Sequence, residues 1–256
     1  MIFAPAPHFL VLCAGRTASV KKVNSIGLVG LAAISIAGCG GGGGTSNPDT
    51  PPSTTPHIYA AGDQWQYDLF GEEMLGGQNL SLSGTETQAV TSTTLSGKPV
   101  LAMTTTDNFI VNNQNVVQST TSYVTQDPTT GAITLVADTQ GPNESVRTVT
   151  KLQITQNGTL ATGSTSASTL TFDDGDVEKT SQAVQGYTFL KVPAGTFNAW
   201  ETLNQETDTN GVASTATQEW VPNLGAFVKA QISGTQPGFT IHFTLALTST
   251  TVQLPQ

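Results

Sequence analysis

The chain has 256 residues, a formal net charge of −9 and only 11 % charged side chains, against roughly 25 % in an ordinary soluble protein. An acidic chain lacks the cationic surface that neutralises phosphates, so we expect no nucleic-acid partner. Of the two cysteines, Cys13 lies in the leader described next, and the sequence therefore predicts no disulfide within the mature chain.

Residues 1–38 are interpreted as a signal peptide. Arg16, Lys21 and Lys22 precede a largely apolar run of 13 residues, 26–38. A helix that spans a bilayer takes roughly 20 residues, so this run is too short to cross one. A basic stretch, a short apolar segment and small residues before the cut are typical of a secretory signal.

The end of this run, Ile36, Ala37, Gly38 and Cys39, resembles the lipobox of bacterial lipoproteins. The resemblance implies cleavage before Cys39, a diacylglycerol on its thiol and a further acyl chain, such as palmitate, on its amine. Two or more acyl chains hold a protein stably on a membrane. The next residue is Gly40 and not Asp, which by the sorting rule of Gram-negative lipoproteins favours the outer membrane. The alternative is an ordinary cleaved signal in which Cys39 has no role.

Residues 39–56 are predicted to be the lipidated cysteine and a disordered tether. Glycines 40–44 are followed as far as Pro56 by Pro, Ser and Thr with one Asn and one Asp, a composition that cannot form a core. Such a chain reaches at most about 50 Å at ~3.1 Å per residue. Six basic and 18 acidic residues follow Cys39, and a polyanion is repelled by anionic lipid. Membrane contact is therefore expected through the lipid anchor.

Residues 57–256 are predicted to form one all-β domain, an antiparallel curled sheet or half-barrel. Trp65, Tyr67 and Leu69 alternate with polar residues, and apolar residues alternate with mostly polar ones over 239–248. One apolar and one polar face are typical of an antiparallel sheet with one wet side. Further strands are expected near 79–94, 98–106, 115–126, 131–138, 145–156, 168–173, 186–192, 196–208, 212–221 and 225–233.

A weak internal echo suggests a duplicated β meander, with 79–156 and 168–256 as the two units. Gly97, Tyr123 and Gly131 in the first unit recur as Gly195, Trp220 and Gly225 in the second. Similar spacing arises easily in β meanders, so the duplication is a hypothesis.

Residues 192–197, Val-Pro-Ala-Gly-Thr-Phe, and the Trp, Pro, Gly and Val-Lys pattern within 219–229 resemble a signature of uncharacterised bacterial lipoproteins and periplasmic proteins. Those families are similar to the open half-barrels of the lipoprotein-carrier (Lol) type, in which a sheet curls around a concave apolar face. The chain departs from the signature at Trp200, where a Cys often stands, and at 221–224. The resemblance implies a fold and carries no activity.

The residues of this signature have a structural interpretation. Proline fixes φ and cannot donate to a strand ladder, and glycine permits tight turns. Turn and core positions account for all six residues: Pro193, Gly195, Phe197, Trp220, Pro222 and Gly225.

Candidate chemistry is thin. Only His57 and His242 follow the leader, too few for the three or four ligands that zinc usually takes or for an evident hydrolase triad. Asp173, Asp174, Asp176 and Glu178 are a weak calcium candidate. They lack the alternating spacing of an EF-hand loop, so a solvated turn is preferred. Glu72 with Glu73 and Glu201 with Glu206 are carboxylate pairs in sequence, but few aromatic residues are available to hold a sugar, so we do not expect a glycosidase.

We therefore expect no enzyme and no cofactor. The sequence favours a lipid-anchored outer-membrane protein whose β domain binds an unidentified protein or apolar ligand in the periplasm. The alternative is a carrier or acceptor of lipids or lipoproteins that uses a concave apolar face, which would appear as an open cavity of several hundred Å³.

Overall fold

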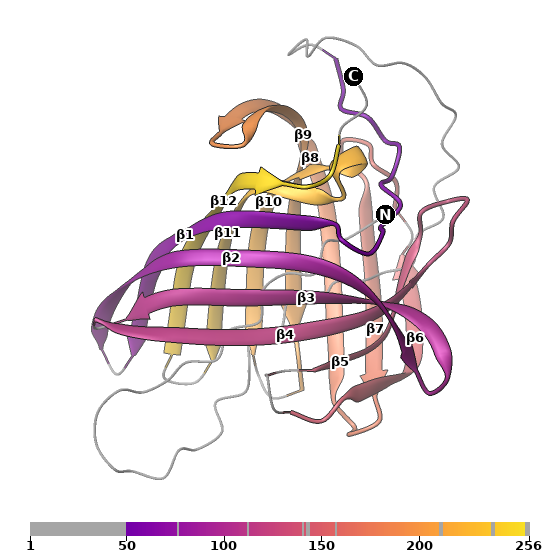
Figure 1. Ribbon diagram of the computed structural model, residues 1–256, viewed down its shortest axis with the longest axis horizontal. Coiled ribbons are helices and arrows are strands. Elements are labelled where there is room, and N and C mark those ends of the chain that lie inside the picture. Colours follow the sequence, from indigo (N-terminus) through magenta and orange to yellow (C-terminus); the bar gives the residue numbers. More distant parts are fainter. Residues whose placement is uncertain are drawn as a thin grey trace.

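The computed structural model describes residues 50–75, 77–111, 113–139, 141, 144–156, 158–209, 212–236 and 239–253. In these residues twelve antiparallel strands form one sheet that closes into a barrel, in the order β1-β12-β11-β10-β9-β8-β7-β6-β5-β4-β3-β2 (Figure 1). The prediction of an all-β antiparallel fold is confirmed. Within the described part, no helix is long and apolar enough to cross a membrane.

The strand bounds agree with most of the expected ranges, but β8 begins at Val177 and not near 186. The elements are β1 (Gln64–Leu75), β2 (Gln78–Leu95), β3 (Lys98–Val111), β4 (Gln114–Gln126), β5 (Ile133–Thr139), β6 (Arg147–Gln156), β7 (Thr165–Phe172), β8 (Val177–Val192), β9 (Gly195–Thr207), β10 (Ala213–Val221), the 3-10 helix η1 (Pro222–Leu224), β11 (Ala226–Gln236) and β12 (Phe239–Thr250).

Closure of the sheet joins the first strand to the last. Trp65 lies opposite Thr250 and Leu75 lies opposite Phe239, with one bulge between Gln66 and Tyr67. The sheet thus curls further than the expected half-barrel. Figure 1 shows β1 to β4 as long curved strands that cross in front of β8 to β12 at a steep angle. The inner faces of two such layers must pack against each other, as in orthogonal sheet packing.

The apolar faces expected in the first and last strands form a filled core. Trp65, Tyr67 and Leu69 are 1 %, 0 % and 0 % exposed. The Tyr67 ring stacks on Phe227 with 4.6 Å between ring centroids, and its hydroxyl donates to the Phe227 carbonyl at 3.2 Å. The indole Nε1 of Trp65 donates to the Leu224 carbonyl at 3.2 Å. These faces are packed and not open, so they do not provide the concave surface that a carrier needs.

A second part of the interior is polar. Many buried side chains of β2 to β4 and of β7 to β10 are Glu, Asp, Gln, Asn, Ser or Thr, beside apolar residues such as Leu82 and Val184. Thr180 and Ser168 share a hydrogen bond of 2.8 Å across β7 and β8, and Asn204 donates to Gln218 at 2.9 Å across β9 and β10. Buried polar groups are stable only when they are partnered in this way. The same pattern explains the missed start of β8, because its inward residues carry no apolar alternation.

The proposed duplication stays a hypothesis. Tyr123 pairs with Ala102 across β3 and β4, and Trp220 pairs with Trp200 across β9 and β10. Gly131 and Gly225 both have positive φ, 68° and 67°. These are local likenesses between corresponding hairpins of one up-and-down barrel.

Residues 50–63, which we call the strap, run over one end of the barrel before β1. The His57 amide donates to the Pro222 carbonyl at 2.8 Å, and the Tyr59 hydroxyl donates to the Gly225 carbonyl at 2.6 Å. Gln126 accepts from the Tyr59 amide at 2.8 Å and donates to the His57 carbonyl at 2.9 Å. The strap is thus joined to both η1 and the end of β4.

Candidate functional site

The outer face of β1, β2, β11 and β12 carries one row of functional side chains. In register order the row is Ser81, Glu72, His242 and Ser233. The imidazole Nδ1 of His242 lies 2.8 Å from the Ser233 hydroxyl. A hollow of about 460 Å³ includes this row, and Phe70 also lines it.

Exposed apolar side chains continue from this hollow across β1, β3 and β4. Phe70, Met74, Ile110 and Val117 are 53 %, 48 %, 50 % and 58 % exposed. Ser83 is the cross-strand neighbour of both Phe70 and Ile110. Asn108 lies opposite Val117 and two residues before Ile110. We call Phe70, Met74, Ile110 and Val117 the apolar face. Clustered exposed apolar residues of this size mark interaction surfaces more often than single ones do.

The chemistry of this surface suits recognition. It combines an exposed phenyl ring, aliphatic and thioether side chains, a carboxylate and an imidazole, which together can contact apolar and cationic groups of a partner. Within the row, a side-chain hydrogen bond joins Ser233 to His242. All side chains of the row lie on the outside of the barrel, where water screens their charges.

Inside the barrel, two carboxyl groups lie side by side. Tyr67, Glu86, Asp107 and Gln118 form one row across β1 to β4. Burial raises the pKa of Asp107 to about 8, and burial followed by the nearby Asp107 charge raises the pKa of Glu86 well above its usual range. Gln88 donates to Glu86 at 2.7 Å. Burial thus favours the uncharged form of both carboxyl groups, because water does not reach them.

The acidic cluster at 173–178 binds an arginine. Arg147 Nε and Nη2 donate to the two oxygens of Asp138 at 2.9 and 2.6 Å. The same guanidinium donates to Asp176 at 3.0 Å and to Glu178 at 2.9 Å, and it lies 4.0 Å above the Phe172 ring.

The calcium candidate is therefore not brought together as a ligand set. Asp173 accepts from the Thr148 amide at 3.0 Å, and Asp174 accepts from the Asp176 amide at 2.9 Å. In the described residues no group of three or more His, Cys, Asp or Glu could hold a metal ion. Residues 173–176 form the turn between β7 and β8, in which Asp173 and Asp174 are exposed, whereas Glu178 is buried in β8 and, with Asp176, binds Arg147.

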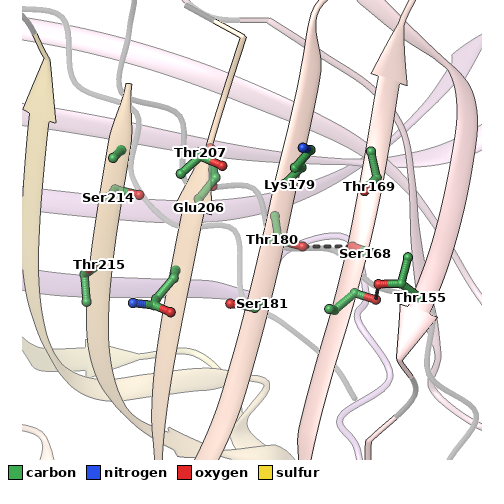
Figure 2. A pocket seen from close by; sticks show the side chains of 13 residues that line it. Thr155, Ser168, Thr169, Lys179, Thr180, Ser181, Glu206, Thr207, Ser214 and Thr215 are labelled. Atoms are coloured by element: carbon green, nitrogen blue, oxygen red, sulfur yellow. Dashed lines mark hydrogen bonds between the residues drawn. The ribbon is translucent and has the colours of Figure 1, made fainter. Parts of the chain in front are cut away.

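A second hollow, of about 450 Å³, lies at the wall formed by β6 to β10 (Figure 2). Its side chains are mostly Ser and Thr, with Lys179, Gln205 and Glu206. Lys179, Ser181, Gln205 and Thr207 are exposed, whereas Ser168, Thr180, Glu206 and Ser214 are buried. The exposed part of this wall thus presents Lys179 and Gln205 beside short Ser and Thr side chains.

The signature residues occupy turn and core positions. Pro193 lies in the turn between β8 and β9, and Gly195 follows it with φ 145°. Phe197 and Trp220 are buried, and Pro222 begins η1. Gly225 ends η1 with φ 67°, and a Cβ atom there would lie 2.9 Å from the Tyr59 ring. Each position thus has a structural reason for its residue type.

The carboxylate pairs are separated by the strand geometry. Glu72 is exposed whereas Glu73 is buried, so the two point to opposite faces of β1. Glu201 and Glu206 are five residues apart in β9 and also lie on opposite faces. His57 lies far along the chain from His242 and bonds instead to Asp63 at 2.7 Å. Ile36, Ala37, Gly38 and Cys39 lie outside the described residues.

The sequence interpretation missed Arg147 and the apolar face. A signal for the latter was present, because Phe70 and Met74 fall on the polar side of the alternation that Trp65, Tyr67 and Leu69 establish in β1. Arg147 gave no such signal, since its three acidic partners come from separate strands and one turn.

Comparison with known proteins gives little further guidance. No family model matches the chain, and no curated protein matches it. Among solved structures, a candidate exported protein with a YmcC-like fold from Bacteroides fragilis is 7 % identical with a TM-score of 0.35, over 77 % of this chain and 99 % of the other. A candidate lipoprotein from Parabacteroides distasonis has the same identity and TM-score, over 78 % and 100 %. Likenesses this distant carry no argument about function.

Proposed function

We propose that this protein is a lipid-anchored lipoprotein of the outer membrane, and that its barrel is a non-catalytic binding module in the periplasm. The lipobox ending at Cys39 supports the anchor. The observation that supports binding is the apolar face beside the Glu72 and His242 row.

The chemistry of the surface specifies the kind of partner. Phe70, Met74, Ile110 and Val117 offer apolar area that water would otherwise cover, and burying such area drives association. Glu72 adds a negative charge next to Phe70. We therefore propose a protein partner that presents apolar side chains together with a basic group, since complementary charges orient such an encounter.

The binding surface can be tested by photo-crosslinking in cells of the native host. A photoreactive phenylalanine analogue replaces Phe70 in one variant. In the control it replaces Gln205, an exposed residue of the second hollow. We expect a discrete adduct from position 70 that the control does not give. Adding the substitution Ile110→Asp should remove this adduct, because a buried charge opposes docking. Identical adducts from both positions, or none from position 70, would contradict the proposal.

The anchor has its own test. Cys39→Ala should leave the membrane fraction and lose the mobility shift that acylation produces on denaturing gels. If the variant remains in the membrane with unchanged mobility, the protein is not a lipoprotein, whatever the crosslinking shows.

A further inference from the structure

The strap continues as far as Thr50 along one face of the β8–β9 hairpin. The Trp200 indole Nε1 donates to the Ser53 carbonyl at 3.3 Å, the Asn198 side-chain amide donates to the Thr50 carbonyl, and Pro52 is buried. The last part of the predicted tether, 50–56, thus contacts the barrel. The chain that leads toward Cys39 leaves the described structure beside Asn198.

The same face of the hairpin carries an exposed aromatic residue and a cation. Phe189 pairs with Asn198, and Tyr187 pairs with Trp200. Phe189 is 39 % exposed. Lys191, two residues further along β8, shares this face and is exposed. We call Tyr187, Phe189, Lys191, Asn198 and Trp200 the strap side of the hairpin.

We propose that the strap side of the β8–β9 hairpin lies against the lipid surface, with Phe189 entering the membrane interface. This inference rests on the lipid anchor proposed above. An aromatic ring and a lysine are the side chains that suit a membrane–water interface, since the ring enters the apolar boundary and the ammonium stays at the headgroups.

Chain length and charge favour this face over the apolar face of β1, β3 and β4. Only eleven peptide steps separate Cys39 from Thr50, which at ~3.6 Å each span at most about 40 Å. The anchored cysteine therefore lies within about 40 Å of Thr50, which is bonded to Asn198. Lys191 is one of only six basic residues after Cys39, whereas Phe70 lies beside the acidic Glu72. Figure 1 shows the hairpin at the top of the barrel and β4 well below it.

The test uses the full lipidated protein in phosphatidylcholine vesicles whose acyl chains carry bromine, a quencher of indole fluorescence. Phe189→Trp places an indole at the proposed contact, and Val117→Trp places one on β4 as the matched control, since both sites are exposed. The three native tryptophans are 1 to 4 % exposed and give a buried background.

We expect brominated vesicles to quench most of the added emission of Phe189→Trp and none of that of Val117→Trp. Adding Asn198→Ala to Phe189→Trp should reduce the quenching, because Thr50 then loses its bond to β9. Equal quenching at both sites, or none at 189 in protein that sediments with the vesicles, would overturn the inference while leaving the anchor intact. Failure to sediment at all would overturn the anchor and this inference with it.

Discussion

Asp107 is a single buried carboxyl group that makes the stability of the barrel depend on pH. It lies between Glu86 and Gln118 on neighbouring strands and is 1 % exposed. Burial raises its pKa from 3.8 to about 8. In the unfolded chain the group ionises near pH 4, so between about pH 4 and 8 folding takes up a proton. The contribution of Asp107 to stability is thus fully present below pH 4, declines as the pH rises and is lost above pH 8.

Asp107→Asn should remove this dependence. Each proton taken up on folding changes the free energy of unfolding by about 1.4 kcal/mol per pH unit. We expect the variant to lose less stability than the native protein between pH 5 and pH 8, as measured from urea midpoints. Glu72→Gln, which alters an exposed carboxyl on β1, is the control and should keep the native slope. An unchanged slope in Asp107→Asn would show that Asp107 ionises normally in the folded protein.

At the scale of the strand, glycines allow the sharp curvature of β1 and β2. Gly71 lies opposite Phe243, and Gly84 lies opposite Phe109. A Cβ atom on Gly71 would lie 2.2 Å from the His242 carbonyl oxygen, and one on Gly84 would lie 2.1 Å from that of Asn108. Only a residue without a side chain permits such close strand approach, which is how curved sheets are bent.

Gly71→Ala should therefore destabilise the junction between β1 and β12. The added methyl cannot be placed without moving backbone, and overpacking of this kind costs about 1–3 kcal/mol. Gly186→Ala is a matched control in β8, where the nearest atom to the new Cβ would be a Glu201 oxygen at an ordinary 3.5 Å. Thermal unfolding should separate the two variants, with a lower midpoint for Gly71→Ala alone. Equal midpoints would mean that the strands can spread at no cost.

The positions of most strands could be predicted from the sequence. Which face of each strand is buried could be predicted only in part. The alternation over 239–248 anticipated β12 because its inward residues are apolar, and residues 192–197 anticipated the β8–β9 hairpin through Pro193 and Gly195. The first half of β8 was missed because Glu178, Thr180 and Gln182 point inward, and a polar interior row has no apolar period. The functional surfaces depend on which face of a strand is exposed to solvent. In the sequence, only Phe70 and Met74 indicate an exposed apolar face, because they fall on the polar side of the alternation.

At the scale of the whole molecule, closure depends on contacts that no local pattern contains. The pairing of β1 with β12 joins residues at opposite ends of the domain. Among the described residues, the seam between β5 and β6 has the fewest register pairs, with Ala137 opposite Thr148 and Asp138 opposite Arg147. The Arg147 side chain reinforces this seam. It forms ion pairs with Asp138 on β5, with Asp176 in the β7–β8 turn and with Glu178 on β8.

Arg147→Met should open the barrel at this seam. Removing one partner of a buried ion pair leaves an uncompensated charge and costs about 3–5 kcal/mol. In this variant the uncompensated charge would be that of Asp138. Burial already raises the pKa of Glu178 to about 8. Hydrogen exchange measured by mass spectrometry should show faster exchange of the amides of β5 and β6 in the variant. The β1–β2 hairpin, which has a continuous register from Gln64 to Leu75, should exchange as in the native protein.

Lys151→Met, an exposed change on β6 itself, is the control for loss of a positive charge. Uniform acceleration in all strands would instead show that the barrel opens only as one cooperative unit, and that the β5–β6 seam is no weaker than the rest.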